Sequence, residues 1–343
     1  MTVVHGGLDE AELRALGVDP AGVLDLSANL HPAGASPAVI QAARSARLDR
    51  YASVDAGPLR AAIAAHEGVP EECVLPTPGA TAAIHLVARA LLAPGLRAVV
   101  VGPTFGEYEA AVAAAGAAVV HVTAEPPSFR PPEVLPAGRL AFVANPNNPT
   151  GAHLSRAELD RWIAPARTLV VDAAYEAFVA DAWDAVDLVR DGADAIVIRS
   201  MTKLHAIPGI RLGYVVAAPE VIASLAVLQP SWSLDATAQA VGPVAVEEHN
   251  ARVALLEGAW TTRARMLAAL SEAGACLGPS MANFVLAEAS DGDAGAARLA
   301  LLREGILVRD CASFGLPSWA RIAVPARQDE ERVIAALARV FGR

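Results

Sequence analysis

Short apolar runs alternate with alanine-rich segments along the chain between residues 75 and 217. The runs cover residues 97–101, 118–122, 140–144, 168–172, 195–199 and 213–216. They are apolar along most of their length rather than at every second position, which is typical of strands in a sheet that helices cover on both faces. The intervening segments predict helices over residues 80–92, 106–115 and 155–163. This alternation predicts an α/β fold with a mainly parallel sheet sandwiched by helices.

The pattern changes after about residue 235. A long helix is expected over residues 236–269 and would connect the sheet to a second unit. That unit contains a strand near 283–286, a helix near 294–304, strands near Leu307 and Ile322, and a terminal helix from Gln328. The segment before His31 has little core of its own and is expected to pack on this unit. We therefore expect a large domain of residues 32–245 and a small α+β domain formed by residues 1–31 and 246–343.

Composition and charge narrow the classes of function. Of the 343 residues, 54% are hydrophobic and 19% are charged, which predicts a sizeable buried core rather than disorder. The formal net charge of −10 argues against nucleic acid or an anionic membrane as a partner. Cys73, Cys276 and Cys311 show no CxxC spacing, so neither a disulfide framework nor a metal site is expected. Because no signal-peptide pattern and no apolar stretch of about 18 residues is found, we expect a cytoplasmic enzyme.

The strongest chemical signal surrounds Lys203. This lysine follows a predicted buried strand, and Ser200, Thr202 and Arg211 lie close to it in the sequence. An amine forms a Schiff base only in its neutral form, which nearby cations and partial burial favour. The two hydroxyl groups and the guanidinium suit a phosphate dianion, because hydrogen bonds from arginine to phosphate are strong and geometrically selective. A single lysine is usually a solvated surface charge, but this setting favours a reactive one.

Two further strand ends carry polar residues. The segment Asn145-Pro-Asn-Asn-Pro-Thr-Gly151 follows one strand, and Asn148 within it can point an amide at a ligand oxygen. A simple turn explains the same composition. Asp172 ends another strand, where a buried carboxylate is costly unless it meets a cation such as a protonated pyridine nitrogen. Capping of a strand-end turn is the simpler explanation for Asp172.

Two glycine-containing turns complete the set. Pro78-Gly79-Ala80-Thr81 opens a predicted helix, and the free backbone N–H groups at a helix start bind phosphate readily. Pro78 has no N–H, which removes one such donor. The second turn, Gly102-Pro-Thr-Phe-Gly-Glu-Tyr108, places Phe105 where it could stack on a flat ring, although a phenylalanine of the core would look the same.

These segments, in this order, resemble the fold-type I enzymes that depend on pyridoxal 5′-phosphate (PLP), and the resemblance covers nearly the whole chain. It implies the aspartate-aminotransferase fold, with PLP as the cofactor and three catalytic residues, Lys203, Asp172 and Tyr175. Lys203 would hold the cofactor covalently, and Asp172 would contact its pyridine nitrogen. Asn148 and Tyr175 would contact its phenolic oxygen, and Phe105 would stack on its ring.

The same resemblance implies a phosphate site and a dimer. The cofactor phosphate would be bound by Gly79, Ala80, Thr81, Ser200 and Arg211, with Thr202 also in the cofactor site. Tyr51, in Arg-Tyr-Ala-Ser, resembles a tyrosine that reaches the cofactor phosphate of the neighbouring subunit. A homodimer with shared active sites is therefore expected.

Two branches of this family compete. The opening His5-Gly-Gly, followed by Asp-Leu-Ser-Ala-Asn29-Leu-His-Pro-Ala-Gly34, resembles L-threonine-O-3-phosphate decarboxylases, as does an arginine pair, Arg309 and Arg321. This resemblance implies PLP-dependent decarboxylation of L-threonine O-3-phosphate to (R)-1-amino-2-propanol O-2-phosphate in cobalamin biosynthesis. The phosphorylated substrate would contact His5, Asn29, Asn148, Arg309 and Arg321. The alternative is a histidinol-phosphate aminotransferase, or an aminotransferase of a related amino acid.

Several positions depart from the decarboxylase pattern. His31 stands where a second asparagine of the opening motif is common, and His205 stands where a tyrosine is common. Pro325 occupies a position where another arginine is frequent. These departures lie on the expected substrate side, so they bear on the substrate more than on the cofactor.

Two readings from other classes have less support. Asn-Pro-x-x-Asn-Pro resembles strand-end motifs of methyltransferases, but those enzymes need an early Gly-x-Gly-x-x-Gly turn, which the sequence lacks. A non-catalytic PLP-binding sensor domain would need an additional basic helix-turn-helix segment, and the chain starts almost directly at its family domain.

Overall fold

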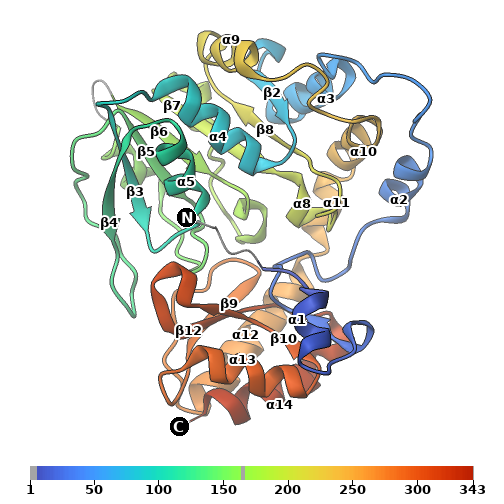
Figure 1. The fold of residues 1–343 in the computed structure, drawn as a ribbon, viewed down its shortest axis with the longest axis vertical. Helices are drawn as coiled ribbons and strands as arrows, with labels where there is room; N and C mark the ends of the chain where they lie inside the picture. Colours follow the sequence, from blue (N-terminus) through green and yellow to red (C-terminus); the bar gives the residue numbers. More distant parts are fainter. Residues whose placement is uncertain (1–5, 164–166, 343) are drawn as a thin grey trace.

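A seven-stranded sheet with the strand order β2-β8-β7-β6-β5-β3-β4 forms the larger part of the molecule (Figure 1). The computed structural model describes residues 6–163 and 167–342. Strands β3 to β7 are parallel, whereas β8 runs antiparallel to both of its neighbours, β2 and β7. The expected mainly parallel sheet is therefore confirmed. The strands are β2 (Val74–Thr77), β3 (Arg97–Gly102), β4 (Ala118–Thr123), β5 (Leu140–Ala144), β6 (Thr168–Asp172), β7 (Ala195–Ser200) and β8 (Gly213–Val216).

Helices cover both faces of this sheet, because successive strand residues point to opposite sides. Val170 and Ile196 pack in one apolar cluster with side chains of α4 (Ala80–Leu91), α5 (Glu107–Ala114) and α9 (Pro219–Leu228). Their strand neighbours Val171 and Val197 pack on the other side with α2 (Pro37–Arg44), α3 (Gly57–Glu67) and α10 (Ala236–Glu247). Two short helices, α6 (Arg156–Asp160) and α7 (Asp187–Arg190), also pack on this second side. The sandwich that the apolar runs predict is confirmed.

A smaller sheet has the order β11-β12-β9 and is antiparallel. Its strands are β9 (Phe284–Glu288), β11 (Arg309–Cys311) and β12 (Leu316–Ala323). The helices α12 (Glu257–Glu272), α13 (Ala294–Arg303) and α14 (Glu330–Phe341) share an apolar cluster with it. Among the described residues, no helix is long and apolar enough to cross a membrane.

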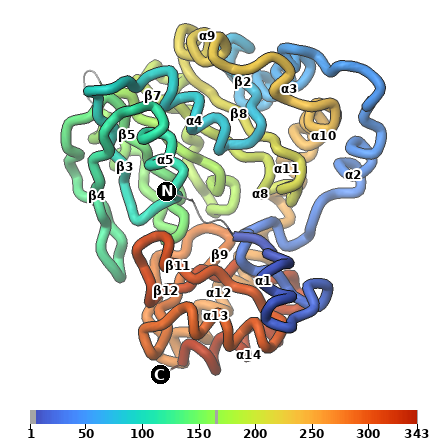
Figure 2. The backbone as a smooth tube through the Cα atoms, in the orientation of Figure 1, coloured from blue at the N-terminus to red at the C-terminus, as the bar shows by residue number. Residues whose placement is uncertain are grey.

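The N-terminal segment joins this smaller unit. Strand β1 (Leu24–Asp25) pairs in parallel with β10 (Ile306–Leu307). Helix α1 (Glu10–Ala15) lies on the smaller unit (Figure 2), where Leu13 packs with Leu307. Leu26 connects the β1–β10 pair to the three-stranded sheet. Its N–H donates to the carbonyl of Leu307 in β10 at 2.8 Å, and its own carbonyl accepts from the N–H of Ala323 in β12 at 2.8 Å. The predicted packing of this segment is confirmed, whereas the domain limits at 31/32 and 245/246 stay a prediction.

The prediction of a single long helix over residues 236–269 is wrong. The structure has three helices there, α10, α11 (His249–Ala254) and α12, with breaks at Glu248 and at residues 255–256. The buried residues of α10 pack against the large sheet, whereas those of α12 pack in the core of the smaller unit. The two ends of this region therefore pack on different cores, which the helical pattern of the sequence does not reveal.

Candidate active site

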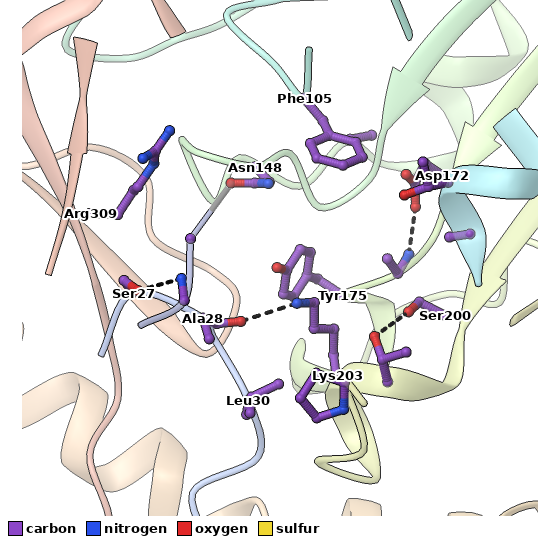
Figure 3. A pocket seen from close by; sticks show the side chains of 18 of the residues that line it. Ser27, Ala28, Leu30, Phe105, Asn148, Asp172, Tyr175, Ser200, Lys203 and Arg309 are labelled. Atoms are coloured by element: carbon purple, nitrogen blue, oxygen red, sulfur yellow. Dashed lines mark hydrogen bonds between the residues drawn. The ribbon is translucent and has the colours of Figure 1, made fainter. Parts of the chain in front are cut away.

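A cavity of about 810 Å³ lies between the large sheet and the smaller unit. It is lined by residues at the carboxyl ends of β5, β6 and β7, where open parallel sheets usually bind ligands, and its size suits a cofactor or small ligand. Most of the predicted site residues line this one cavity, and Figure 3 shows several of them converging on it. They are Ala80, Thr81, Phe105, Asn148, Asp172, Tyr175, Ser200, Thr202, Lys203, Arg211, Arg309 and Arg321.

Lys203 is presented to the cavity by the short helix α8 (Met201–Leu204), which directly follows β7. Its Nζ donates a hydrogen bond of 3.1 Å to the carbonyl of Ala28, as Figure 3 shows. Its own carbonyl accepts from the N–H of His31 at 3.0 Å. The lysine is therefore held at the junction between the large sheet and the N-terminal segment, with its amine in the cavity.

Asp172 carries a buried carboxylate, whose negative charge a nearby cation would stabilise. It ends β6 and is 7% exposed. Its Oδ2 accepts from the Tyr108 hydroxyl at 2.7 Å, and its Oδ1 accepts from the N–H of Ala174 at 3.0 Å. Burial raises the pKa of Asp172, while these hydrogen bonds and the charge of Lys203 oppose the rise. None of the ion pairs among the described residues includes Asp172, so a protonated pyridine nitrogen fits this position.

The start of α4 forms a cradle that only glycine permits. Gly79 has φ +84°, and a Cβ there would lie 2.7 Å from Nη2 of Arg211. A Cβ on Gly213, in the neighbouring strand β8, would lie 2.8 Å from the backbone nitrogen of Ala80. Gly79 is absent from the cavity lining, but the residues on either side of it line the cavity. Arginine and helix-start N–H groups on a glycine turn suit a phosphate dianion.

The aromatic side of the cavity comes from two loops. Phe105 lines it, and its ring meets the ring of Tyr108 edge-on at 5.9 Å. Tyr175 lines it from the loop after β6, and its hydroxyl accepts a long 3.4 Å hydrogen bond from Asn29. Asn29 itself is fully buried and does not line the cavity. The structure thus places Asn29 against Tyr175 rather than on the cavity surface where direct substrate contact was expected.

Two arginines face each other at the opposite wall. Arg309 and Arg321 are direct partners across the antiparallel pair β11–β12, and they are 8% and 4% exposed. Arg321 donates to Asn148 Oδ1 and to the carbonyl of Ser27, and Arg309 donates to Ser313 Oγ at 2.6 Å. Burial, with a further contribution from Arg321, lowers the pKa of Arg309. Since like charges opposite each other destabilise a sheet, this arrangement points to an anionic ligand.

Two predicted residues lie elsewhere. Tyr51 is 84% exposed, and its ring packs at 5.0 Å against Trp232, outside the cavity of this subunit. His5 lies outside the described residues. The predicted role of Tyr51 concerns a neighbouring subunit, so it stays a prediction.

Sequence reasoning assigned no role to several residues of the cavity wall. Tyr108, Ser27, Gly6 and Gly7 all line it. The spacing of Phe105 and Tyr108 at the start of a helix was the available signal for Tyr108, since residues three apart lie on one face. Ser27 belongs to the opening motif, but the motif gave it no role; its importance comes from contacts with distant residues.

The donor set matches the chemistry of PLP. The Lys203 amine, the buried Asp172 carboxylate and Arg211 line the same cavity, with the Gly79 turn beside Arg211. The amine suits the aldehyde of that cofactor, and the carboxylate suits its ring nitrogen. Arg211 and the glycine turn suit its phosphate. Among the described residues, no group of three or more His, Cys, Asp or Glu residues is arranged to hold a metal ion.

Comparison with known proteins agrees with this chemistry. Residues 21–340 match the family Aminotransferase class I and II. Histidinol-phosphate aminotransferase 2 of Ralstonia nicotianae is 33% identical over 342 residues, covering 94% of this chain and 90% of that protein. The histidinol-phosphate aminotransferase of Sinorhizobium meliloti, solved in complex with pyridoxal-5′-phosphate, has a TM-score of 0.84 at 22% identity, with coverage of 98% and 95%. The L-threonine-O-3-phosphate decarboxylase of Porphyromonas gingivalis has a TM-score of 0.81 at 25% identity, with coverage of 92% and 98%.

The expected threonine-phosphate decarboxylase activity is contradicted by these relatives. Curated relatives that are 32–35% identical over most of the chain are named histidinol-phosphate aminotransferase. Two residues of the opening motif that favoured the decarboxylase have backbone roles that do not depend on the substrate. Asn29 has φ +52° and Gly34 has φ +69°, conformations that asparagine and glycine tolerate best whatever the substrate is.

Proposed function

The chain belongs to the class I and II aminotransferases and its cofactor is PLP, and from this premise we propose that it transfers the amino group of histidinol phosphate or a closely related phosphorylated amine. The observation that carries the proposal is the buried pair Arg309 and Arg321, which lines the same cavity as Lys203. Two guanidinium groups offer bidentate hydrogen bonds to a phosphate. The names of the curated relatives support the same substrate class.

The chemistry is divided between cofactor and protein. When bound, PLP supplies an aldehyde that takes up amino groups and a ring that withdraws electrons. Lys203 is our candidate to hold the cofactor and to move the proton at the substrate α-carbon. The Asp172 carboxylate would stabilise positive charge at the ring nitrogen, because opposite charges attract strongly in a buried site.

The arginine wall would orient the substrate. Arg321 donates to Asn148, in the turn after β5, and to Ser27, in the N-terminal segment, so its guanidinium connects these two parts of the molecule. A phosphate held there would fix the orientation of the donor relative to Lys203, which lines the same cavity. Correct orientation of this kind lowers barriers by several kcal/mol (on the order of 7 or more in well-ordered cases).

We also propose that the enzyme is a homodimer whose sites are completed by Tyr51. The side chain of Tyr51 is 84% exposed, and Leu48 and Val54 near it are 83% and 60% exposed. Exposed apolar residues at this density are typical of a surface that a partner covers. Sedimentation velocity tests the dimer. Weaker cofactor binding in Tyr51→Ser, without a loss of the dimer, would support the shared site.

The proposed reaction has a direct test. PLP-loaded protein is mixed with histidinol phosphate without any keto acid, and the visible absorbance of the cofactor is followed. Conversion of the aldehyde form to the amine form, absent in Lys203→Ala, is the expected result. Histidinol without its phosphate is the matched control and should react far more slowly. Equal reaction of the two amines would contradict the proposed substrate class.

A further inference from the structure

Residues 6–8 lie on the wall of the cavity, although they are near the start of the chain. Gly6, Gly7 and Leu8 all line it, beside Ser27 and Arg321. The N–H of Gly7 donates a hydrogen bond of 2.8 Å to Ser27 Oγ. The segment is therefore attached to the pocket through a specific contact, and the proposed transamination does not by itself explain why.

Each of the two glycines is required for a different reason. A Cβ on Gly6 would lie 2.3 Å from the carbonyl oxygen of Ser27 and 3.3 Å from Nη2 of Arg321, so any side chain would displace one of them. Gly7 has open space around it but a φ of +120°, which only glycine adopts without strain. Neither glycine has a side chain that could pack in one of the hydrophobic cores. The pair thus serves close approach to Ser27 and Arg321 rather than stability.

Ser27 connects this segment to the arginine. It is 3% exposed, and its carbonyl accepts from Arg321. Its Oγ accepts from Gly7 and donates to Asp25 Oδ1 at 2.6 Å, while its N–H donates to the same oxygen at 2.8 Å. Asp25 thus fixes the orientation of Ser27, and one residue holds both the wall segment and the guanidinium.

We propose that residues 6–8 form a wall of the substrate site over Arg321, and that Ser27 is the positioning residue that couples this wall to the arginine. The ligand would be the phosphate-bearing end of the amino donor, an identity that rests on the proposed function. A wall at this position excludes water from the guanidinium. The attraction between Arg321 and a phosphate is stronger where water is excluded.

A double-mutant cycle in the full-length, PLP-loaded enzyme tests the coupling. Ser27→Ala removes the hydroxyl but keeps the carbonyl that holds Arg321, and Gly7→Ala strains the segment. Each change should raise the KM for histidinol phosphate about fivefold, as expected for one lost hydrogen bond, with kcat within about twofold. The double variant should be no worse than the poorer single variant, because both changes break the same contact.

Gly17→Ala is the matched control. Gly17 also has a positive φ, +72°, with nothing near its Cβ, but it does not line the cavity. Its substitution strains the same region of the chain and should leave the KM unchanged. Additive effects of Ser27→Ala and Gly7→Ala, or an equal KM increase in Gly17→Ala, would overturn the proposal.

Hydrogen exchange separates this inference from the proposed function. In the PLP-loaded wild type, inorganic phosphate should slow amide exchange in the peptide that contains residues 6–8. Ser27→Ala should speed that exchange about tenfold and abolish the response to phosphate. If histidinol phosphate is not a substrate but this response to phosphate is present, the proposed function is wrong and the proposed wall of residues 6–8 is supported. Exchange that is unaffected by both Ser27→Ala and phosphate would refute the wall.

Discussion

The Tyr108 hydroxyl donates a hydrogen bond of 2.7 Å to Asp172, and the two side chains are 1% and 7% exposed. The ring of Tyr108 stacks on Phe142 at 5.5 Å with an interplanar angle of 11°, so packing fixes the position of the hydroxyl. Burial raises the pKa of Tyr108 well above its usual value, with the charge of Asp172 adding to the rise. The tyrosine is therefore a neutral, rigid donor that orients the Asp172 carboxylate, which would contact the pyridine nitrogen of the cofactor.

Tyr108→Phe should weaken cofactor binding. The substitution removes a hydrogen bond that lowers the pKa of Asp172, so that pKa should rise further and the carboxylate should hold the ring nitrogen less well. We expect about a five- to tenfold higher Kd for PLP, and a visible absorbance spectrum that depends on pH over a shifted range. Tyr214→Phe is the control, since Tyr214 is equally buried but its hydroxyl donates to Glu67. A similar loss in both variants would mean that Tyr108 has only a structural role.

Asp172→Asn should stabilise the apoprotein while it impairs cofactor use. Because burial raises the folded-state pKa of Asp172, the folded state binds more protons than the unfolded state between the unfolded and folded pKa values. Its ionisation therefore costs stability as pH rises through that range, and the cost persists at neutral pH. Urea unfolding of the apoprotein at pH 7 should show a higher free energy of unfolding for Asp172→Asn. A lower value would mean that the carboxylate is favourably solvated where it lies.

Arg309→Met should separate substrate binding from stability. Loss of a charge-assisted hydrogen bond to the phosphate should raise the KM for the phosphorylated donor about 10- to 100-fold. The apoprotein should be no less stable, because the substitution removes one of two like charges that face each other across β11–β12. Arg339→Met, at an exposed arginine paired with Glu304, is the control and should leave the KM unchanged. A KM that is unchanged in Arg309→Met would remove Arg309 from the substrate site.

Acid should destabilise the protein through two buried histidines, His31 and His205, and the half-buried His249. Burial, the largest cause in each case, lowers the pKa of His31 to about 4, of His205 to about 3 and of His249 to about 4. The rings of His249 and His66 lie 4.4 Å apart, so a charge on one opposes a charge on the other. The unfolded chain binds protons near pH 6.5 and the folded chain does not. Stability is therefore present above pH 6.5 and is lost as pH falls towards 4.

The free energy of unfolding should fall between pH 6.5 and pH 5, by up to about 1.4 kcal/mol per pH unit for each histidine. Urea titrations at the two pH values measure this slope. His249→Gln should reduce the slope, whereas His121→Gln, at a side chain that is 58% exposed, should not. If His249→Gln has the same slope as the wild type, other groups cause the acid sensitivity.

Six of the seven strands of the large sheet, and the place of Lys203 directly after one of them, could be predicted from the sequence alone, whereas β2 was not predicted. A strand that is buried on both faces must be apolar at nearly every position, so β5 and β6 were expected with the bounds that the structure has, Leu140–Ala144 and Thr168–Asp172. A polar residue at the end of such a strand then marks the ligand edge of the sheet. This is why Asp172 and Lys203 could be placed in one site without any knowledge of distances.

Only the tertiary structure decided which distant groups meet. The long helix expected over residues 236–269 is three helices because its two ends pack on different cores. The antiparallel register sets Arg309 opposite Arg321, and Ser27 meets both Gly7 and Arg321 through contacts that span up to 294 residues of sequence. Local propensity and periodicity act over a few residues. Such pairs depend instead on how whole elements pack, and no local pattern encodes that arrangement.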